Sequence, residues 1–133
     1  MAKRLNLMLA MIGAVAVAAI GTSAAAKPDH GDGCFLSRNW QGWSAPGDGD
    51  FLLLRVGVSD IYRVDLSPGV HVRKDIDRVL VNIMRGSDWI CSPLDLDLTL
   101  SDRWGGFREP LIARSIRKLT PDEVAVIPRR DLP

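Results

Sequence analysis

Two aspartates, Asp95 and Asp97, have a spacing that suits catalysis or metal binding. They alternate with leucines in a run that reads Leu-Asp-Leu-Asp-Leu-Thr-Leu-Ser over residues 94–101. On a β-strand, residues two apart share a face with side chains about 7 Å apart, which suits a metal ion or an acid/base pair. The same alternation is typical of a half-buried strand whose polar face meets basic neighbours such as Arg114 or Arg117. We favour this second interpretation, because neither aspartate has a histidine or a glycine-rich ligand loop nearby.

Hard oxygen ligands also occur in the loops. The residues concerned are Asp29, His30, Asp32, Asp48 and Asp50. A calcium site requires ligands at regular spacing and a closing bidentate acid, which this set lacks, whereas turn chemistry explains these residues directly. His71 has no nucleophile placed beside it by a recognisable motif. We therefore predict no catalytic residue, no metal site and no cofactor.

The tryptophans are the more promising set, because an exposed Trp can stack on a sugar or anchor a protein partner. Trp40 and Trp89 lie close in sequence to the two cysteines, and we expect them to pack around a disulfide in the core. The other two stand at predicted turns or strand ends, as do several arginines, which serve equally as interface anchors and as turn braces. The predicted binding surface comprises Trp43, Trp104, Arg38 and Arg85.

The first residues have the pattern of a targeting signal. Lys3 and Arg4 precede a small, apolar run at 7–20, and small residues at 23–26 offer a cleavage site. The run is shorter than the roughly 20 apolar residues that a membrane span needs. We expect a Sec-type signal peptide at 1–26, cleaved near Ala26, and a bacterial protein that is periplasmic or secreted, with no stable membrane span afterwards.

The remainder has the size of one domain. The leader carries two of the 17 basic residues and none of the 16 acidic ones, so 15 basic residues face 16 acidic ones in the other 107. This balance gives no electrostatic case for binding nucleic acid or anionic lipid. We expect a flexible segment at 27–33, a single domain at 34–128 and a short tail at 129–133.

The chain has two cysteines, Cys34 and Cys91, and both follow the leader. In an oxidising compartment two such thiols pair by default. Free thiols or a metal site would call for closer spacing or histidine neighbours. We predict a structural disulfide, worth about 4 kcal/mol for a loop of this size.

Residues 51–66 predict the β-hairpin around which the chain is organised. The register that keeps apolar residues on one face also satisfies one ion pair on the other. The predicted pairs are Val58 with Tyr62, Val56 with Val64, Leu54 with Leu66, and, on the outer face, Arg55 with Asp65. The shortest loop for this register strains the β-branched Ile61, so a wider loop or a bulge near Gly57 is expected.

The other elements follow from turn and capping residues. Turns are predicted at 44–50, 67–69 and 104–106, and strands at 94–101, with four inward leucines, and at 111–119. The run at 78–84 fits either a buried strand or a short helix, and its β-branched residues favour a strand. Thr120, Pro121 and Glu123 form the capping box of a helix that Pro128 ends. The predicted fold is α+β: a small, mainly antiparallel sheet with a short C-terminal helix.

The order of several short motifs resembles a family of small exported bacterial proteins classed as a domain of unknown function. The motifs are Cys34 with 38–40, then 62–67, 85–87 leading into 90–92, 95–97 and 119–124. Members of that family often carry a second cysteine pair, near the positions of Val70 and Pro110. Both are absent here, which implies that Cys34 pairs with Cys91. The family has no assigned activity, so the resemblance implies a framework and no chemistry.

Taken together, the sequence predicts an exported envelope protein that binds another protein or a cell-envelope ligand without catalysis. Two other classes stay open. A small hydrolase or metal-dependent enzyme would need the Asp95 and Asp97 face to line a cleft with a perturbed pKa. An inhibitor of a secreted hydrolase would need a rigid loop protruding near the disulfide, for which residues 45–50 are the candidate.

Overall fold

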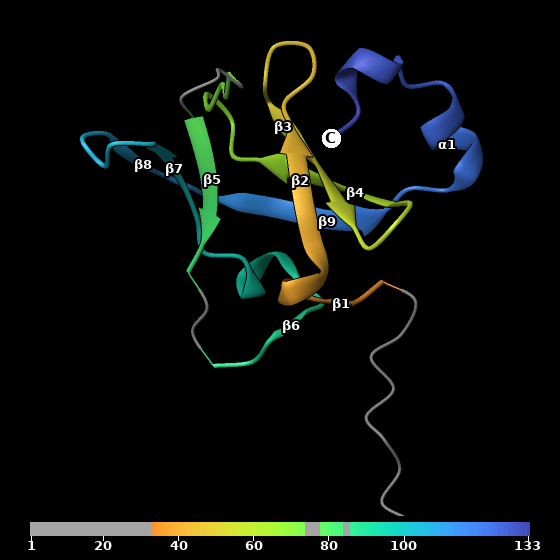
Figure 1. Cartoon of the computed structure of the whole chain (residues 1–133), viewed down its shortest axis with the longest axis horizontal. Coiled ribbons are helices and arrows are strands. Elements are labelled where there is room, and N and C mark those ends of the chain that lie inside the picture. Colours follow the sequence, from red (N-terminus) through yellow and green to blue (C-terminus); the bar gives the residue numbers. More distant parts are fainter. Residues whose placement is uncertain (1–32, 74–77, 84–85) are drawn as a thin grey trace, which may run out of the picture.

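A computed structural model describes residues 33–73, 78–83 and 86–133 (Figure 1). The predicted signal peptide at 1–26, nearly all of the segment at 27–33, and Arg85 lie outside the described residues. The strands are β1 (Phe35–Leu36), β2 (Trp40–Ser44), β3 (Phe51–Val56), β4 (Asp60–Leu66), β5 (Arg78–Asn82), β6 (Trp89–Ile90), β7 (Leu98–Asp102), β8 (Arg108–Leu111) and β9 (Ala113–Lys118). The helical elements are α1 (Pro121–Ala125) and three 3₁₀ turns, η1 (Ser37–Asn39), η2 (Pro93–Asp95) and η3 (Arg129–Asp131).

The larger strands form two antiparallel sheets that the chain joins where β8 leads into β9, and we call the joined pair the curled layer. Their order is β2-β3-β4-β9 in one sheet and β5-β7-β8 in the other. β8 leads into β9 across Ile112, which is exposed and whose carbonyl accepts a hydrogen bond from Ser67 N–H at 3.0 Å. The predicted single strand at 111–119 is therefore wrong at its start: the chain bends at Ile112 and passes from one sheet to the other. The curled layer has two free ends, β2 and β5.

The main core lies between the two sheets. Leu52, Leu54 and Val64 come from the larger sheet and Leu98 and Leu100 from the smaller one, all in one buried cluster. A two-stranded ladder, β1 with β6, lies beyond one end of the layer, and the Cys34–Cys91 disulfide sits next to it. The predicted disulfide is confirmed. The turns at Pro68–Gly69 and at Trp104–Gly105 are also confirmed, with glycine at positive φ in each.

The hairpin has the predicted inner face but a different register. Leu54 lies opposite Tyr62 and Leu52 opposite Val64, so the partner of each β4 residue is four residues earlier in β3 than predicted. The turn takes residues 57–59, and Val58 is 95% exposed in it rather than paired. Gly57, which as a glycine tolerates its φ of +61°, begins the turn. Ile61 therefore stays within β4. The expected wider loop or bulge is therefore wrong: the turn has three residues, 57–59, placed two residues earlier than the shortest predicted loop, and Ile61 is not strained.

The prediction for the outer face of the hairpin, an Arg55–Asp65 pair, is wrong. Asp65 accepts hydrogen bonds from Arg63, at 2.7 Å, and from Ser115 Oγ, while Arg55 lies opposite Ile61. Desolvation opposes the bonds from Ser115 and Arg63, and the balance holds the pKa of Asp65 below its ordinary value. Leu53 and Ile61 on this face are buried in a second cluster, completed by Leu119, Val124, Ile127 and Leu132. The C-terminal residues therefore cover a face that the alternation assigned to solvent.

The helix α1 begins as predicted. Thr120 Oγ1 accepts from Glu123 N–H at 3.3 Å, and Thr120 N–H donates to Glu123 Oε2 at 2.8 Å, with Pro121 at the first helical position. Bonds from Arg117 and from the Thr120 N–H lower the pKa of Glu123 to about 2. The helix is only five residues long. The fold is thus mainly antiparallel β with little helix, which fits α+β only loosely, and the ambiguous run at 78–84 contains the strand β5.

The strand at 94–101 begins later than predicted. Pro93 opens the turn η2, Leu94 is 94% exposed, and β7 starts at Leu98. Three of the four leucines, Leu96, Leu98 and Leu100, are buried as expected. Proline cannot donate a ladder hydrogen bond, which explains why regular pairing does not reach back to Leu94.

The loop between β2 and β3 is held against the body of the protein. Gly49 has φ +74°, and its carbonyl accepts a hydrogen bond from Val72 N–H at 2.8 Å. A Cβ at Gly49 would collide with the Val72 backbone, whereas a Cβ at Gly47, with φ +61°, would meet nothing within 4 Å. Gly49 is therefore required both for its backbone angle and for the close approach of two chain segments.

These two glycines provide a matched test. Gly47→Ala is expected to lower the free energy of unfolding by about 1–2 kcal/mol, the cost of a positive φ for an L-residue. Gly49→Ala pays the same cost and adds a further ~1–3 kcal/mol of overpacking against Val72. Urea denaturation of both variants measures the difference, and equal losses would contradict the close approach at Val72.

Candidate functional site

The carboxylate of Asp95 is used in the structure of the turn that carries it. Asp95 Oδ2 accepts hydrogen bonds from Cys91 N–H at 2.9 Å and Ser92 N–H at 2.8 Å, and Ser92 Oγ lies at 3.2 Å. The two backbone N–H donors favour the ionised form, so the pKa of Asp95 lies below its ordinary value. Asp95 closes a capping box on η2, directly after the disulfide. Its arrangement is that of a cap.

Asp95 and Asp97 do not share the face of a strand. Asp97 lies between η2 and β7, where its N–H donates to Asn82 Oδ1 at 2.8 Å and its carbonyl accepts from Ile83 N–H at 2.9 Å. Both aspartates line a hollow of about 410 Å³ together with Ser87. Within 33–73, 78–83 and 86–133, no group of three or more His, Cys, Asp or Glu side chains is arranged to hold a metal ion.

The tryptophans divide differently from the prediction. Trp43 is only 9% exposed and belongs to the main core, because it lies opposite Leu54 on the inner face of the sheet. Its predicted exposure is wrong. Trp104 is 88% exposed in the turn between β7 and β8, as a surface contact requires. Trp40 and Trp89 are half-buried, and Trp40 packs against the main core.

The predicted arginines are only partly placed. Arg38 is exposed in η1, next to β2, whereas Arg85 lies outside the described residues. Arg38 lines one of the four main surface hollows among the described residues. Trp104, in the turn between β7 and β8, lines none of them. The predicted binding surface is therefore not assembled as one site.

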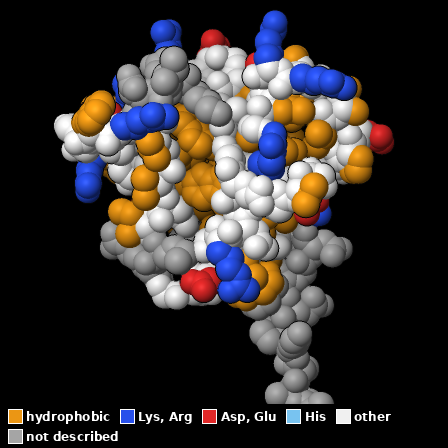
Figure 2. All heavy atoms as spheres, viewed as in Figure 1, with side chains coloured by type: hydrophobic (Ala, Val, Ile, Leu, Met, Phe, Trp, Pro, Cys, Tyr) orange, Lys and Arg blue, Asp and Glu red, His pale blue; other side chains and the backbone are white. Residues whose placement is uncertain are grey.

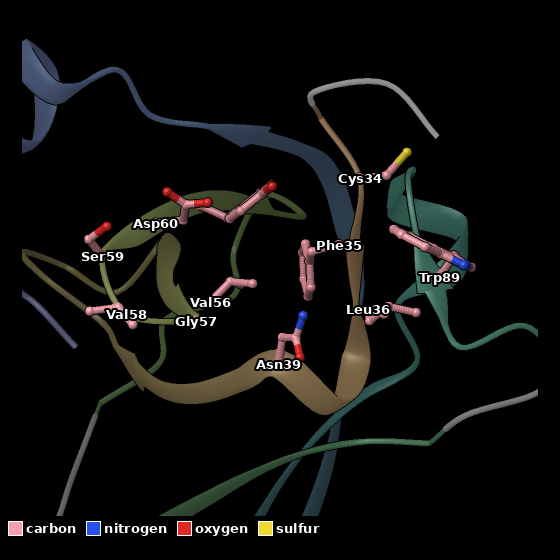
Figure 3. Close-up of a pocket in the computed structure, with 11 residues that line it drawn as sticks. Cys34, Phe35, Leu36, Asn39, Val56, Gly57, Val58, Ser59, Asp60 and Trp89 are labelled. Carbon is pink, nitrogen blue, oxygen red and sulfur yellow. The ribbon is translucent and has the colours of Figure 1, made fainter. Parts of the chain in front are cut away.

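A pocket of about 330 Å³ lies between β1 and the β3–β4 turn (Figure 3). Figure 3 shows Phe35 and Asn39 pointing into the pocket, with Val58 and Ser59 on the opposite side of it. The Phe35 and Tyr62 rings, which both line the pocket, meet at a tilt of 56° with their centroids 4.6 Å apart. Asp60, the acidic residue among those lining it, pairs with Lys118 Nζ at 2.8 Å. The pocket is thus mainly a packing feature beside the disulfide.

A larger groove lies between the two free ends of the layer, and we call it the seam. It has a volume of about 490 Å³ and is lined from β2, from β5 and, at one end, from η1. Its lining residues are Ser37, Arg38, Trp40, Gln41, Gly42, Trp43, Val79, Leu80, Val81 and Asn82. Figure 2 shows hydrophobic side chains gathered in the hollow between β5 and β2. The seam is mainly apolar and open to solvent.

Sequence reasoning named two residues of the seam, Arg38 and Trp43, but not the groove itself or its β5 wall. The signal was present in the run Val79-Leu80-Val81, which has no charge between Arg78 and Asn82. Val79 and Val81 are 38% and 42% exposed, because they alternate with the buried Leu80 on an edge strand. What the sequence did not supply was the position of this strand beside β2, which is more than thirty residues earlier in the chain.

Comparisons of the chain with family models, with curated proteins and with solved structures found no match. Among the residues that the structure describes, no helix is long and apolar enough to cross a membrane.

Replacing each tryptophan tests this assignment. Trp43→Ala is expected to cost about 3–5 kcal/mol of unfolding free energy, as large-to-small changes in a core do. Trp104→Ala should stay within about 0.5 kcal/mol, because its side chain makes little buried contact. Thermal denaturation followed by far-UV circular dichroism distinguishes the two. A large loss for Trp104→Ala, or none for Trp43→Ala, would reverse the assignment.

Asp95→Ala tests the cap. We expect a loss of about 0.5–1 kcal/mol at pH 7, in the lower part of the range for helix caps, because Asp95 is exposed and water screens its bonds. Its pKa is lowered in the folded state, so its stabilisation is present above the ordinary value of 3.8 and declines as pH falls through the folded pKa. Melting temperatures of the two proteins should therefore converge below pH 4; a constant gap down to pH 2 would contradict this.

Proposed function

We propose that the chain is an exported bacterial envelope protein that acts as a non-catalytic binding module. The basic, apolar and small-residue pattern at 1–26 supports export with cleavage near Ala26, into the periplasm or the medium. The Cys34–Cys91 disulfide supports an oxidising compartment. The resemblance to small exported bacterial proteins of unknown function, carried by the order of the motifs, supports the same assignment.

The observation that carries the binding function is the seam. An apolar hollow on the surface of a small protein marks a site of interaction more often than a random feature of packing. The walls combine the aromatic rings of Trp40 and Trp43 with the aliphatic side chains of Val79 and Val81. Tryptophan and arginine are the residues most enriched at the energetic centre of interfaces, and Arg38 stands at one end.

The two other classes draw less support from the geometry. For an enzyme, the Asp95 oxygen that would accept a proton already accepts two backbone hydrogen bonds and is held ionised. For an inhibitor, the loop at 45–50 would have to protrude near the disulfide. Instead Gly49 binds Val72 and Asp50 O accepts from Leu66 N–H at 3.0 Å, which ties the loop to the body.

A photo-crosslinker at the seam tests the proposal. With Val81 replaced by p-benzoylphenylalanine in the full exported chain, irradiation of the envelope fraction should give discrete crosslinked products that excess unlabelled protein removes. Val126 is an exposed valine just after α1, away from β5 in Figure 1, and is the matched control. Identical products from both positions, or none from Val81, would contradict a binding role for the seam.

A further inference from the structure

The curled layer consists of two sheets that the chain joins at one place. β8 and β9 follow each other through Ile112 without pairing, which leaves β2 and β5 as the end strands away from this bend. Each of these two strands is the last in its sheet, with a neighbour on one side only. In Figure 1 they lie beside one another with their arrows pointing in opposite directions. The seam is the space between these two edge strands.

Within the described stretch 78–83, β5 has no proline and no bulge that would protect it as an edge strand. Natural edges are blunted with charge, proline or bulges, because unpaired backbone groups recruit other strands. β5 carries Val79, Leu80 and Val81 in succession, and its one charged residue, Arg78, lies at its first position. The Arg78 guanidinium stacks over the Phe107 ring at 4.4 Å, which directs it to the β7–β8 side. The edge of β5 is therefore suited to pairing.

The opposite wall is fixed in place. The outward face of β2 is covered by C-terminal residues: Ser44 Oγ donates to Asp131 O at 2.6 Å, and Gly42 lies against Pro133. On the inner side, Trp40 Nε1 donates to Gly42 O at 2.8 Å, which holds the indole against its own strand. The tryptophan wall of the seam is therefore preorganised, which reduces the entropic cost of binding.

The charge of the seam selects the occupant. Among the described residues that line it, Arg38 is the charged one and is exposed, whereas the polar residues Ser37, Gln41 and Asn82 are neutral. An occupant that carries a carboxylate at this end would form an ion pair, whereas a basic one would meet Arg38 with like charge. Apolar side chains at alternate positions would face the hollow, because successive residues of a strand point to opposite sides.

We propose that the seam binds an extended segment of a partner protein, which inserts between β2 and β5 as an additional strand and places a carboxylate at Arg38. This inference rests on the proposed binding function and specifies its ligand. Main-chain hydrogen bonds to the edge of β5 supply affinity. Side chains of the segment supply specificity: those on its inner face lie beside Trp43, and those on its outer face lie beside Val79 and Val81. The segment runs parallel to one wall strand and antiparallel to the other.

The probe is a synthetic nonapeptide of alternating valine and threonine that ends in aspartate. Its control has the same side chains but N-methyl groups on alternate backbone amides, which prevents strand pairing. The exported chain should bind the first peptide at least tenfold more tightly than the second. Hydrogen exchange should slow at the amides of β5 on binding. Val81→Lys should abolish binding and Val126→Lys should leave it unchanged.

A second comparison isolates the carboxylate. With the C-terminus of both peptides amidated, R38Q should weaken binding of the peptide ending in aspartate about two- to fivefold, the range for an exposed ion pair, and should leave the peptide ending in asparagine unaffected. Arg38 lies in an exposed 3₁₀ turn, so R38Q is expected to fold normally. Its melting temperature, compared with that of the native chain, checks this. An equal effect of R38Q on both peptides would overturn the assignment of the carboxylate.

The outcomes separate this inference from the binding function. Equal binding of the methylated and unmethylated peptides, abolished by Val81→Lys, overturns strand addition while the seam stays a binding site. Absence of peptide binding together with retained crosslinks at Val81 overturns the extended-segment ligand alone. A concentration-dependent dimer that Val81→Lys disrupts would identify a second copy of the chain as the occupant and overturn the partner segment. Loss of the Val81 crosslinks overturns the binding function itself.

Discussion

Burial of the β3–β4 hairpin on both faces is the constraint on which the rest of the structure depends. Leu52, Leu54 and Val64 face the smaller sheet, while Leu53 and Ile61 face the C-terminal residues. A strand buried on both sides reads as a continuous apolar run, as residues 51–54 do. Both faces of the hairpin are apolar and would be costly to expose to water. The disulfide-linked end and the smaller sheet bury one face, and α1 with the residues after it buries the other.

The same demand explains the open seam. To cover the inner face, the chain must bend from one sheet into the other, and it does so at Ile112 between β8 and β9. That bend brings β5 round toward β2 and leaves both as ends of the layer. A layer that curls without closing has two strand edges and an apolar hollow between them. The hollow is thus a consequence of how the core is covered, and it is also the surface best suited to a ligand.

The candidate site was predicted poorly, for a physical reason that particular residues illustrate. Asp95 and Asp97 alternate as on a strand, but Pro93 begins a 3₁₀ turn whose N–H groups bind the Asp95 carboxylate. Trp43 is close in sequence to a glycine-rich loop, yet in the sheet it lies opposite Leu54 and its side chain is buried. For Asp95 the deciding residue, Pro93, is nearby in the sequence and the alternation was misread as a strand, whereas for Trp43 the deciding neighbour lies on another strand and was not visible. Arg38 kept its predicted exposure because a 3₁₀ turn at the surface needs no distant partner.

By itself the sequence determined what depends on local sterics and on the compartment: glycine and proline turns, the Thr120 capping box, the Cys34–Cys91 pair and the inward parity of Leu54 and Tyr62. These features follow from the conformations that a few adjacent residues allow. Only the tertiary structure decided the hairpin register, the burial of Leu53 and Ile61, and the meeting of β2 with β5 at the seam. Each of these is a contact between segments far apart in the chain, and its free energy comes from apolar surface removed from water, which no local pattern specifies.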